Sequence, residues 1–105
     1  MNTNALIAIT MGDPAGIGPE IIAKVFDTGE IFSLCRPVII GHAGVMKKIV
    51  EDLRLSVSIR ALKDLAGTDP APGKADVVSI GKVDLASHAW GRPTAASGKA
   101  VVEYI

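Results

Sequence analysis

Short apolar runs separated by glycine, proline and charged residues make up much of this chain. Runs of this length without polar alternation are typical of strands buried in a parallel sheet. Such runs occupy residues 5–10, 37–41 and 75–80. Residues 55–60 instead alternate strictly between apolar and polar, which predicts a strand with one solvated face near a sheet edge.

The segments between these runs show apolar residues at helical spacing. One helix is expected over about 19–27, ending at a glycine, and a second over 45–53. One further helical turn is expected near 31–34, and a last helix begins at Thr94, a good N-cap. Residues 64–74 hold two glycines and two prolines, so we expect a loop there.

Strands that alternate with helices indicate an α/β fold. We expect a mainly parallel sheet with helices on both faces, and a length of 105 residues suits one domain or part of one. The last expected helix still carries an apolar stripe (Val101, Tyr104 and Ile105) where the sequence stops, without glycine, proline or a cationic last turn. We therefore expect residues 1–105 to be the N-terminal part of a longer α/β domain.

Composition narrows the functional class. The chain is 49% hydrophobic, and its 11 basic residues balance its 11 acidic ones. A neutral chain offers no general surface to nucleic acid or to acidic membranes, so we expect neither as a partner. The single cysteine, Cys35, rules out an internal disulfide and is interpreted as a small apolar filler. A single cysteine fits a reducing compartment most simply, so we expect a cytoplasmic protein. No targeting or membrane-spanning segment is recognised in the sequence.

The stretch from Thr10 to Glu20, TMGDPAGIGPE, links the first strand to the first helix and holds the leading candidate site. Its glycines permit positive φ and close backbone approach, and Pro19 suits a first helical turn. Open α/β sheets bind ligands beyond the carboxyl ends of their strands, and a helix N-terminus offers N–H donors to an anion. The candidate residues for cofactor or substrate binding are Gly12, Asp13, Gly16 and Gly18.

Known phosphate-binding fingerprints do not fit this loop. A dinucleotide fingerprint needs a third glycine where Ile21 stands, and the Gly-Lys-Ser/Thr of a P-loop does not follow. A plain structural turn is therefore an open alternative. Asp13 can cap N–H groups of its own turn or accept from a ligand hydroxyl, and we favour the first because Asx turns are common beside Pro and Gly. We expect Gly16→Val to lower stability or activity.

Other polar residues receive structural interpretations. His42 follows the second strand and is interpreted as a polar loop residue rather than a general base, because no partner is identifiable. His88 is interpreted as a solvated loop residue, because two distant histidines and one cysteine lack metal-ligand spacing. Arg92 and Lys99 flank the start of the last helix and could meet a phosphate, although a solvated loop is favoured. We assign no catalytic residue and no metal ligand.

Residues 9–20, ITMGDPAGIGPE, resemble the opening of the 4-hydroxythreonine-4-phosphate dehydrogenase family, which includes 4-phosphothreonate and 4-phosphoerythronate dehydrogenases. Residues 16–20 also resemble the opening of isocitrate and isopropylmalate dehydrogenases, but the inserted Pro14-Ala15 favours the first family. The resemblance implies an isocitrate/isopropylmalate dehydrogenase-like fold. It also implies NAD- or NADP-dependent oxidation of a phosphorylated hydroxy acid, such as 4-phosphohydroxy-L-threonine or 4-phospho-D-threonate, to a β-keto acid that can lose carbon dioxide.

The resemblance further implies pyridoxine biosynthesis, a divalent metal (Zn, Mg or Co) and a homodimer for the full-length protein. The family's metal ligands and substrate-binding residues lie beyond residue 105, so none transfers to this chain, and we expect the 105 residues alone to be inactive and marginally stable. The run from Arg92 to Gly98 leans towards the threonate and erythronate enzymes. The alternative is a non-catalytic α/β module that binds a phosphorylated small molecule. Histidines in metal-ligand context after Ile105 would favour the dehydrogenase.

Overall fold

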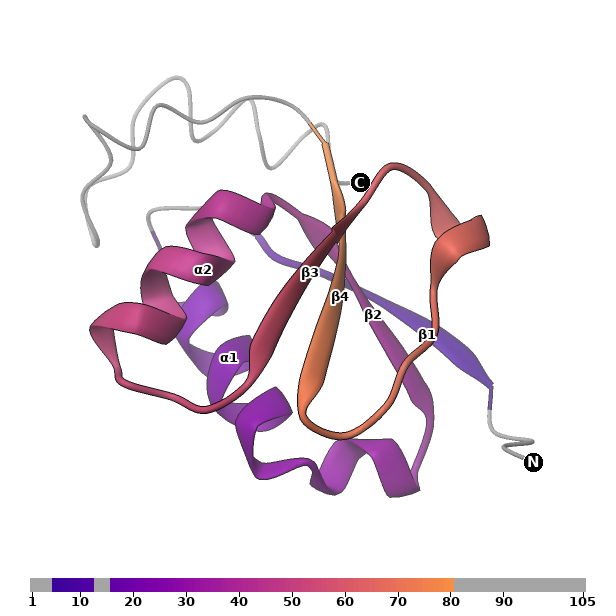
Figure 1. Ribbon diagram of the computed structural model, residues 1–105, viewed down its shortest axis with the longest axis horizontal. Coiled ribbons are helices and arrows are strands. Elements are labelled where there is room, and N and C mark those ends of the chain that lie inside the picture. The colour runs from indigo at the N-terminus through magenta and orange to yellow at the C-terminus, as the bar shows by residue number, and fades with distance from the viewer. Residues whose placement is uncertain (1–4, 13–15, 81–105) are drawn as a thin grey trace.

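The computed structural model describes residues 5–12 and 16–80. Over this part the chain forms one four-stranded sheet in the order β1-β2-β4-β3, with every pairing parallel (Figure 1). The strands are β1 (Leu6–Thr10), β2 (Arg36–Gly41), β3 (Ser58–Leu62) and β4 (Lys74–Ser79). The helices are α1 (Gly18–Thr28) and α2 (Ala43–Asp52), with 3-10 turns η1 (Glu30–Ser33) and η2 (Leu65–Gly67). The predicted α/β class with a parallel sheet is confirmed.

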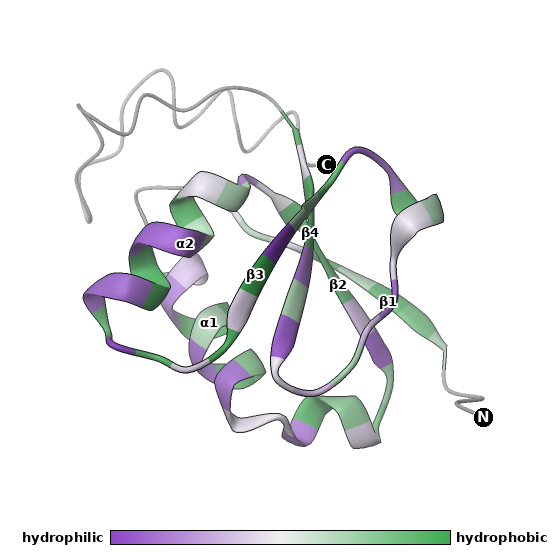
Figure 2. Cartoon of the chain, in the orientation of Figure 1, coloured by the Kyte–Doolittle hydropathy of each residue, from purple (hydrophilic) through white to green (hydrophobic). Residues whose placement is uncertain are grey.

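Both described α-helices pack on one face of the sheet, so the expected placement of helices on both faces is not seen in residues 5–12 and 16–80. Ile39 of β2 lies beside Val77 of β4 in the register, so their side chains share this face. They join one buried cluster with Phe26 of α1 and with Met46 and Ile49 of α2. Figure 2 shows the resulting pattern, with apolar and polar bands alternating along α2. The connection from β3 to β4, which contains η2, bonds to side chains on the opposite face of the sheet.

α1 carries two apolar stripes, and the fold buries one of them. Ala23 and Phe26 are buried against the sheet, whereas Ile17, Ile21 and Val25 are 73%, 51% and 38% exposed. The sequence alone could not choose between the stripes, because both have helical spacing. The exposed stripe leaves α1 with an apolar outer face in the described part of the chain.

The ends of α1 follow local chemistry. The helix begins one residue before the predicted Pro19 and ends at Thr28, where Gly29 adopts φ of 76° as the left-handed cap. Glu20 and Lys24 pair at 3.9 Å across one helical turn. The expected extra turn is present as η1. These features were all predicted from short-range sequence signals, which do not depend on the rest of the fold.

Among the described strands, β3 lies at a sheet edge, as predicted, but it begins at Ser58 rather than at residue 55. The reason is a competing acceptor. The N–H groups of Ser56 and Val57 donate to Oδ1 of Asp27, at 2.8 and 3.1 Å, instead of to a neighbouring strand. This carboxylate ties the end of α1 to the segment before β3, and strand pairing starts only after it.

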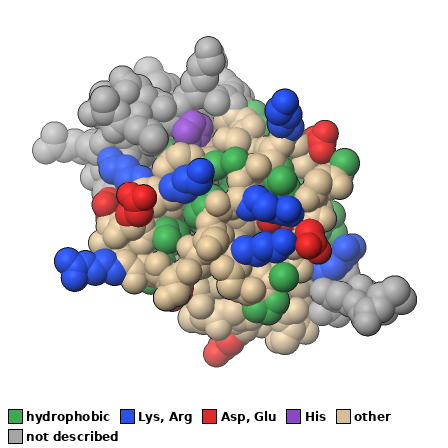
Figure 3. All heavy atoms as spheres, in the orientation of Figure 1, with side chains coloured by type: hydrophobic (Ala, Val, Ile, Leu, Met, Phe, Trp, Pro, Cys, Tyr) green, Lys and Arg blue, Asp and Glu red, His purple; other side chains and the backbone are tan. Residues whose placement is uncertain are grey.

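The surface in Figure 3 shows Lys and Arg side chains interspersed with Asp and Glu over the face presented. This mixture fits the balanced composition of the chain. In the described residues, no helix has both the length and the apolar character needed to cross a membrane.

Candidate functional site

Three strands end side by side at one edge of the sheet. Because the sheet is parallel, Thr10 of β1, Gly41 of β2 and Ser79 of β4 all lie at its carboxyl edge. The glycine loop follows β1 there, and α2 begins directly after β2. This edge is where open α/β sheets bind ligands, so the structure places the predicted loop in the expected position for a site.

Met11 attaches the glycine loop to the sheet. Its side chain is buried, and its N–H donates to the Ile40 carbonyl at 2.9 Å, which extends the β1–β2 pairing by one residue. A Cβ at Gly18 would collide with the Met11 carbonyl oxygen. A Cβ at Gly41 would lie 2.6 Å from the Met11 Cβ. Two glycines from different elements thus make room for one methionine, and we call Met11, Gly18 and Gly41 the Met11 junction.

The glycines of the loop are needed for different reasons. Gly12 has φ of 75°, a left-handed conformation, and open space where a Cβ would stand. Its requirement is conformational. Gly18 is required for close approach, as described above. Gly16 is half-buried in the bend before α1, and its predicted sensitivity to valine stays a prediction. Asp13 lies outside the described residues.

α2 begins at the same edge and is capped by side chains. Nδ1 of His42 accepts the N–H of Val45 at 3.3 Å, and Oγ of Ser79 accepts the N–H of Ala43 at 3.1 Å. An imidazole nitrogen that accepts a hydrogen bond carries no proton, so the cap requires this nitrogen of His42 to be unprotonated. The structure thus gives His42 a capping role at the start of α2, and its exclusion as a general base stays a prediction.

α1 differs from α2 at its start. Its N-cap is Ile17, whose side chain makes no capping hydrogen bond, and Pro19 brings no N–H group to the first turn. The N–H groups of Gly18 and Glu20 therefore have no cap from the N-cap side chain. A helix start of this kind is compatible with an anionic group of a ligand, although Glu20 adds a negative charge nearby.

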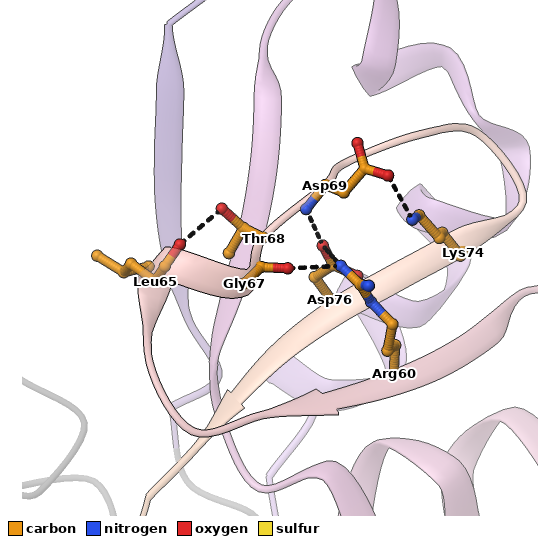
Figure 4. Close-up of polar contacts among 7 residues, drawn as sticks. All are labelled: Arg60, Leu65, Gly67, Thr68, Asp69, Lys74 and Asp76. Carbon is orange, nitrogen blue, oxygen red and sulfur yellow. Dashed lines mark hydrogen bonds and ion pairs between the residues drawn. The ribbon is translucent and has the colours of Figure 1, made fainter.

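A polar cluster lies on the opposite face of β3 and β4 (Figure 4). The Asp76 carboxylate, 1% exposed, accepts from Nε and Nη2 of Arg60 at 2.8 and 2.9 Å and from the Asp69 N–H at 2.7 Å. Nη2 of Arg60 also donates to the Gly67 carbonyl at 2.8 Å, and Lys74 pairs with Asp69 at 3.2 Å. We call these five residues the Asp76 cluster. It joins both strands to their connection.

Burial alone would raise the pKa of Asp76. The hydrogen bond from Arg60, the N–H of Asp69 and the charges of Arg60 and Lys74 outweigh it and hold that pKa below its usual value. The same hydrogen bond raises the pKa of Arg60. This lowered pKa makes the Asp76 carboxylate a weak base near neutral pH. Its contacts give the cluster the role of fastening the connection to both strands.

Comparison with known proteins covers the whole chain. No family model matches it. A protein of Symbiobacterium thermophilum that carries the provisional name D-threonate 4-phosphate dehydrogenase is 40% identical over all 105 residues. A 4-hydroxythreonine-4-phosphate dehydrogenase of Desulforapulum autotrophicum is 37% identical over 100 residues, or 95% of the chain. The resemblance to the 4-hydroxythreonine-4-phosphate dehydrogenase family is confirmed.

Solved structures of this family share the fold. The crystal structure of a 4-hydroxythreonine-4-phosphate dehydrogenase from Burkholderia phymatum superposes on 99% of the chain with a TM-score of 0.89 and 26% identity. The one from Klebsiella pneumoniae covers 97% with a TM-score of 0.84 and 28% identity. The chain spans only 31% of the S. thermophilum relative and 29% of the D. autotrophicum relative. The similarity therefore concerns a part of these dehydrogenases.

The described residues do not by themselves form the divalent metal site that the family resemblance implies. In the ranges 5–12 and 16–80, no three side chains of His, Cys, Asp or Glu come together in a way that could hold an ion. Cys35 is half-buried, with its Sγ 3.8 Å from the Ile31 carbonyl. His88, Arg92 and Lys99 lie outside the described residues, as does the helix expected from Thr94. A metal ion would need ligands from outside the described ranges.

Sequence reasoning placed the loop correctly but missed the residues that hold it. The sequence pattern does not single out Met11 or Ser79, and it places Gly41 at the end of a strand and the start of the turn into the second helix. One usable signal was present, because an isolated glycine in a strand often marks close approach of another backbone. A comparable signal existed for Asp76, the one acidic residue of β4, which stands directly before two valines.

Proposed function

We propose that this chain forms part of an NAD- or NADP-dependent dehydrogenase that oxidises a phosphorylated hydroxy acid. The observation that carries the proposal is the 40% identity to the S. thermophilum protein over every residue of the chain. The same fold in solved 4-hydroxythreonine-4-phosphate dehydrogenases supports it. Two substrates are the leading candidates, 4-phosphohydroxy-L-threonine and 4-phospho-D-threonate, because relatives of both names match at similar identity.

The reaction is the transfer of a hydride from the substrate's secondary alcohol carbon, with loss of the hydroxyl proton. The nicotinamide cofactor, when bound, accepts the hydride. The task proposed for this chain is binding and orientation at the carboxyl edge of the sheet. Gly12, Asp13, Gly16 and Gly18 form the proposed binding loop. Glycines that lack a Cβ let a ligand approach the main chain closely, and this supports the assignment of the loop to cofactor or substrate.

The start of α1 adds an electrostatic reason. Its first-turn N–H groups have no side-chain cap from Ile17, and the helix dipole makes this end partly positive. The substrate's phosphate and carboxylate and the cofactor's pyrophosphate are all anionic, so each suits this end. The described residues supply no ligand set for a metal ion.

The proposal also includes a homodimer in the cytoplasm and a place in pyridoxine biosynthesis for the hydroxythreonine substrate. The mass of the purified complete protein, measured by light scattering after gel filtration, tests the first of these. A monomer at micromolar concentration would overturn the dimer without affecting the proposed chemistry.

Turnover of the complete protein tests the function. Each candidate acid is incubated with NAD or NADP and a divalent metal, and absorbance at the reduced-nicotinamide band is followed. We expect reduced cofactor with at least one acid, and no turnover by residues 1–105 alone. Calorimetric binding of a phosphorylated acid without turnover by the complete protein would instead favour the non-catalytic binding module. Reduced cofactor produced by the 105 residues alone would contradict the assignment of chemistry to other parts of the protein.

A further inference from the structure

We propose that Met11 is a positioning residue of the candidate site. Its place between Gly41 and Gly18 determines where the main chain of Gly12 and Gly18, which border the loop on either side, lies relative to the carboxyl edge of the sheet. This inference rests on the proposed function, since the loop's role in binding belongs to that proposal. Met11 itself is assigned no contact with substrate or cofactor, because its side chain is buried.

Three parts of Met11 are fixed by three different neighbours. Its N–H donates to Ile40 at 2.9 Å. Its side chain fills the space above Gly41, where a Cβ would lie 2.6 Å from its Cβ, 3.3 Å from its Cγ and 3.0 Å from its Sδ. Its carbonyl oxygen faces Gly18 so closely that a Cβ there would collide. The next residue, Gly12, then turns with a positive φ of 75°. The direction in which the loop leaves the sheet follows from these contacts.

The backbone of Gly41 is fixed by its contacts with β4. Its carbonyl accepts the N–H of Ile80 at 2.7 Å, and it pairs with Ser79 in the β2–β4 register. The clash between a methyl group added at Gly41 and the Met11 side chain therefore cannot be relieved by a shift of β2. Rotation of the Met11 side chain cannot relieve it either, because the closest atom is the Met11 Cβ. The displacement has to occur in the backbone around Met11, at the start of the loop.

A small displacement there matters if the loop binds ligand. A misplacement of about 1 Å in a positioning element can cost about 100-fold in rate. Gly41→Ala should therefore act on the candidate site from a buried position. We expect a rise in KM for substrate or cofactor and faster hydrogen exchange at the Gly12 amide. Both changes should exceed what a loss of folded protein alone would cause.

The test compares Gly41→Ala with Gly67→Ala in the complete protein. Gly67 is a matched control, because a Cβ there would meet only the Leu62 Cδ2 at 3.5 Å, an ordinary contact. We expect Gly41→Ala to lower kcat/KM by about 10- to 100-fold at a temperature well below its melting midpoint. The backbone amide of Gly12 should exchange with solvent faster than in the wild type. Gly67→Ala should change neither quantity.

A second substitution at Met11 distinguishes the clash with Gly41→Ala from a general folding defect. Combining Gly41→Ala with Met11→Gly removes the Cβ contact, whereas combining it with Met11→Ala leaves that contact in place. With activity normalised to the folded fraction, we expect the Met11→Gly combination to recover more kcat/KM than the Met11→Ala combination. The inference is overturned if Gly41→Ala matches Gly67→Ala in kcat/KM and Gly12 exchange, or if both combinations behave alike. A wild-type protein without turnover would overturn the proposed function instead, and the Gly12 exchange comparison would still decide the role of Met11.

Discussion

The Met11 junction and the Asp76 cluster hold the same sheet together by opposite means. At the junction, a buried methionine fits against two glycines, and the space has no room for an added methyl group. In the cluster, a buried carboxylate accepts hydrogen bonds from Arg60 and Asp69, and the arrangement rests on the charge of that carboxylate. The comparison teaches that steric packing determines the structure at the candidate ligand edge, whereas charged hydrogen bonds determine it where β3 and β4 meet their connection. Each region should therefore respond to a different kind of perturbation.

The largest expected effect is at the junction. Gly18→Ala places a Cβ against the backbone oxygen of Met11, which no side-chain rotation can relieve. We expect the free energy of unfolding to fall by about 3 kcal/mol, the upper end of ordinary overpacking. Urea denaturation followed by circular dichroism measures it. The control is again Gly67→Ala, which should stay within about 0.5 kcal/mol of wild type. Equal stability of the two variants would show that the junction is not sterically tight.

The next effect is in the cluster. Asp76→Asn keeps the shape of the side chain but turns an amide donor or a neutral oxygen towards Arg60, so at least one buried donor loses its acceptor. We expect a loss of about 1–3 kcal/mol in the free energy of unfolding. Lys74→Ala breaks the pair with the 81% exposed Asp69 side chain and removes the smallest of the contributions that lower the pKa of Asp76. It should cost no more than about 1 kcal/mol. If both variants cost the same, the cluster is no more than a set of surface ion pairs.

Acid should separate the two regions. The pKa of Asp76 in the folded chain lies below that of an unfolded aspartate, so its stabilisation is complete above about pH 4 and is lost as pH falls through the folded-state pKa. We expect the urea midpoint to fall more steeply between pH 5 and pH 2 in the wild type than in Asp76→Asn. Gly18→Ala should retain the wild-type slope. Parallel curves for wild type and Asp76→Asn would contradict the assigned pKa direction.

Local signals in the sequence predicted most of the described fold. Periodicity, Pro19 and Gly29 located α1 within one residue at each end, because caps and turns depend on nearby residues. The start of β3 could not be predicted, because it depends on Asp27, about 30 residues away in sequence. The glycine loop was recognised as a candidate site, but its attachment through Met11 and Gly41 depends on a contact between two strands. Such contacts have no periodic signature in one sequence.

The smallest expected effect is at the start of α2. Ser79→Ala removes the acceptor for the Ala43 N–H but leaves the His42 cap in place. We expect a loss of about 1 kcal/mol in the free energy of unfolding, typical of one hydrogen bond or cap. Because Ser79 lies at the ligand edge, this variant also measures how much a polar contact contributes to stability there. A cost above that of Asp76→Asn would mean that polar contacts, rather than shape, dominate this edge.

The most direct test of the account compares one loop variant with one cluster variant in the complete protein. Gly12→Ala meets no atom but forces a Cβ into a left-handed conformation, which costs about 1–2 kcal/mol. The account predicts that kcat/KM falls about tenfold or more in Gly12→Ala and stays within about twofold of wild type in Asp76→Asn at pH 7, although Asp76→Asn loses at least as much stability. A tenfold loss in Asp76→Asn with an unchanged Gly12→Ala enzyme would contradict it.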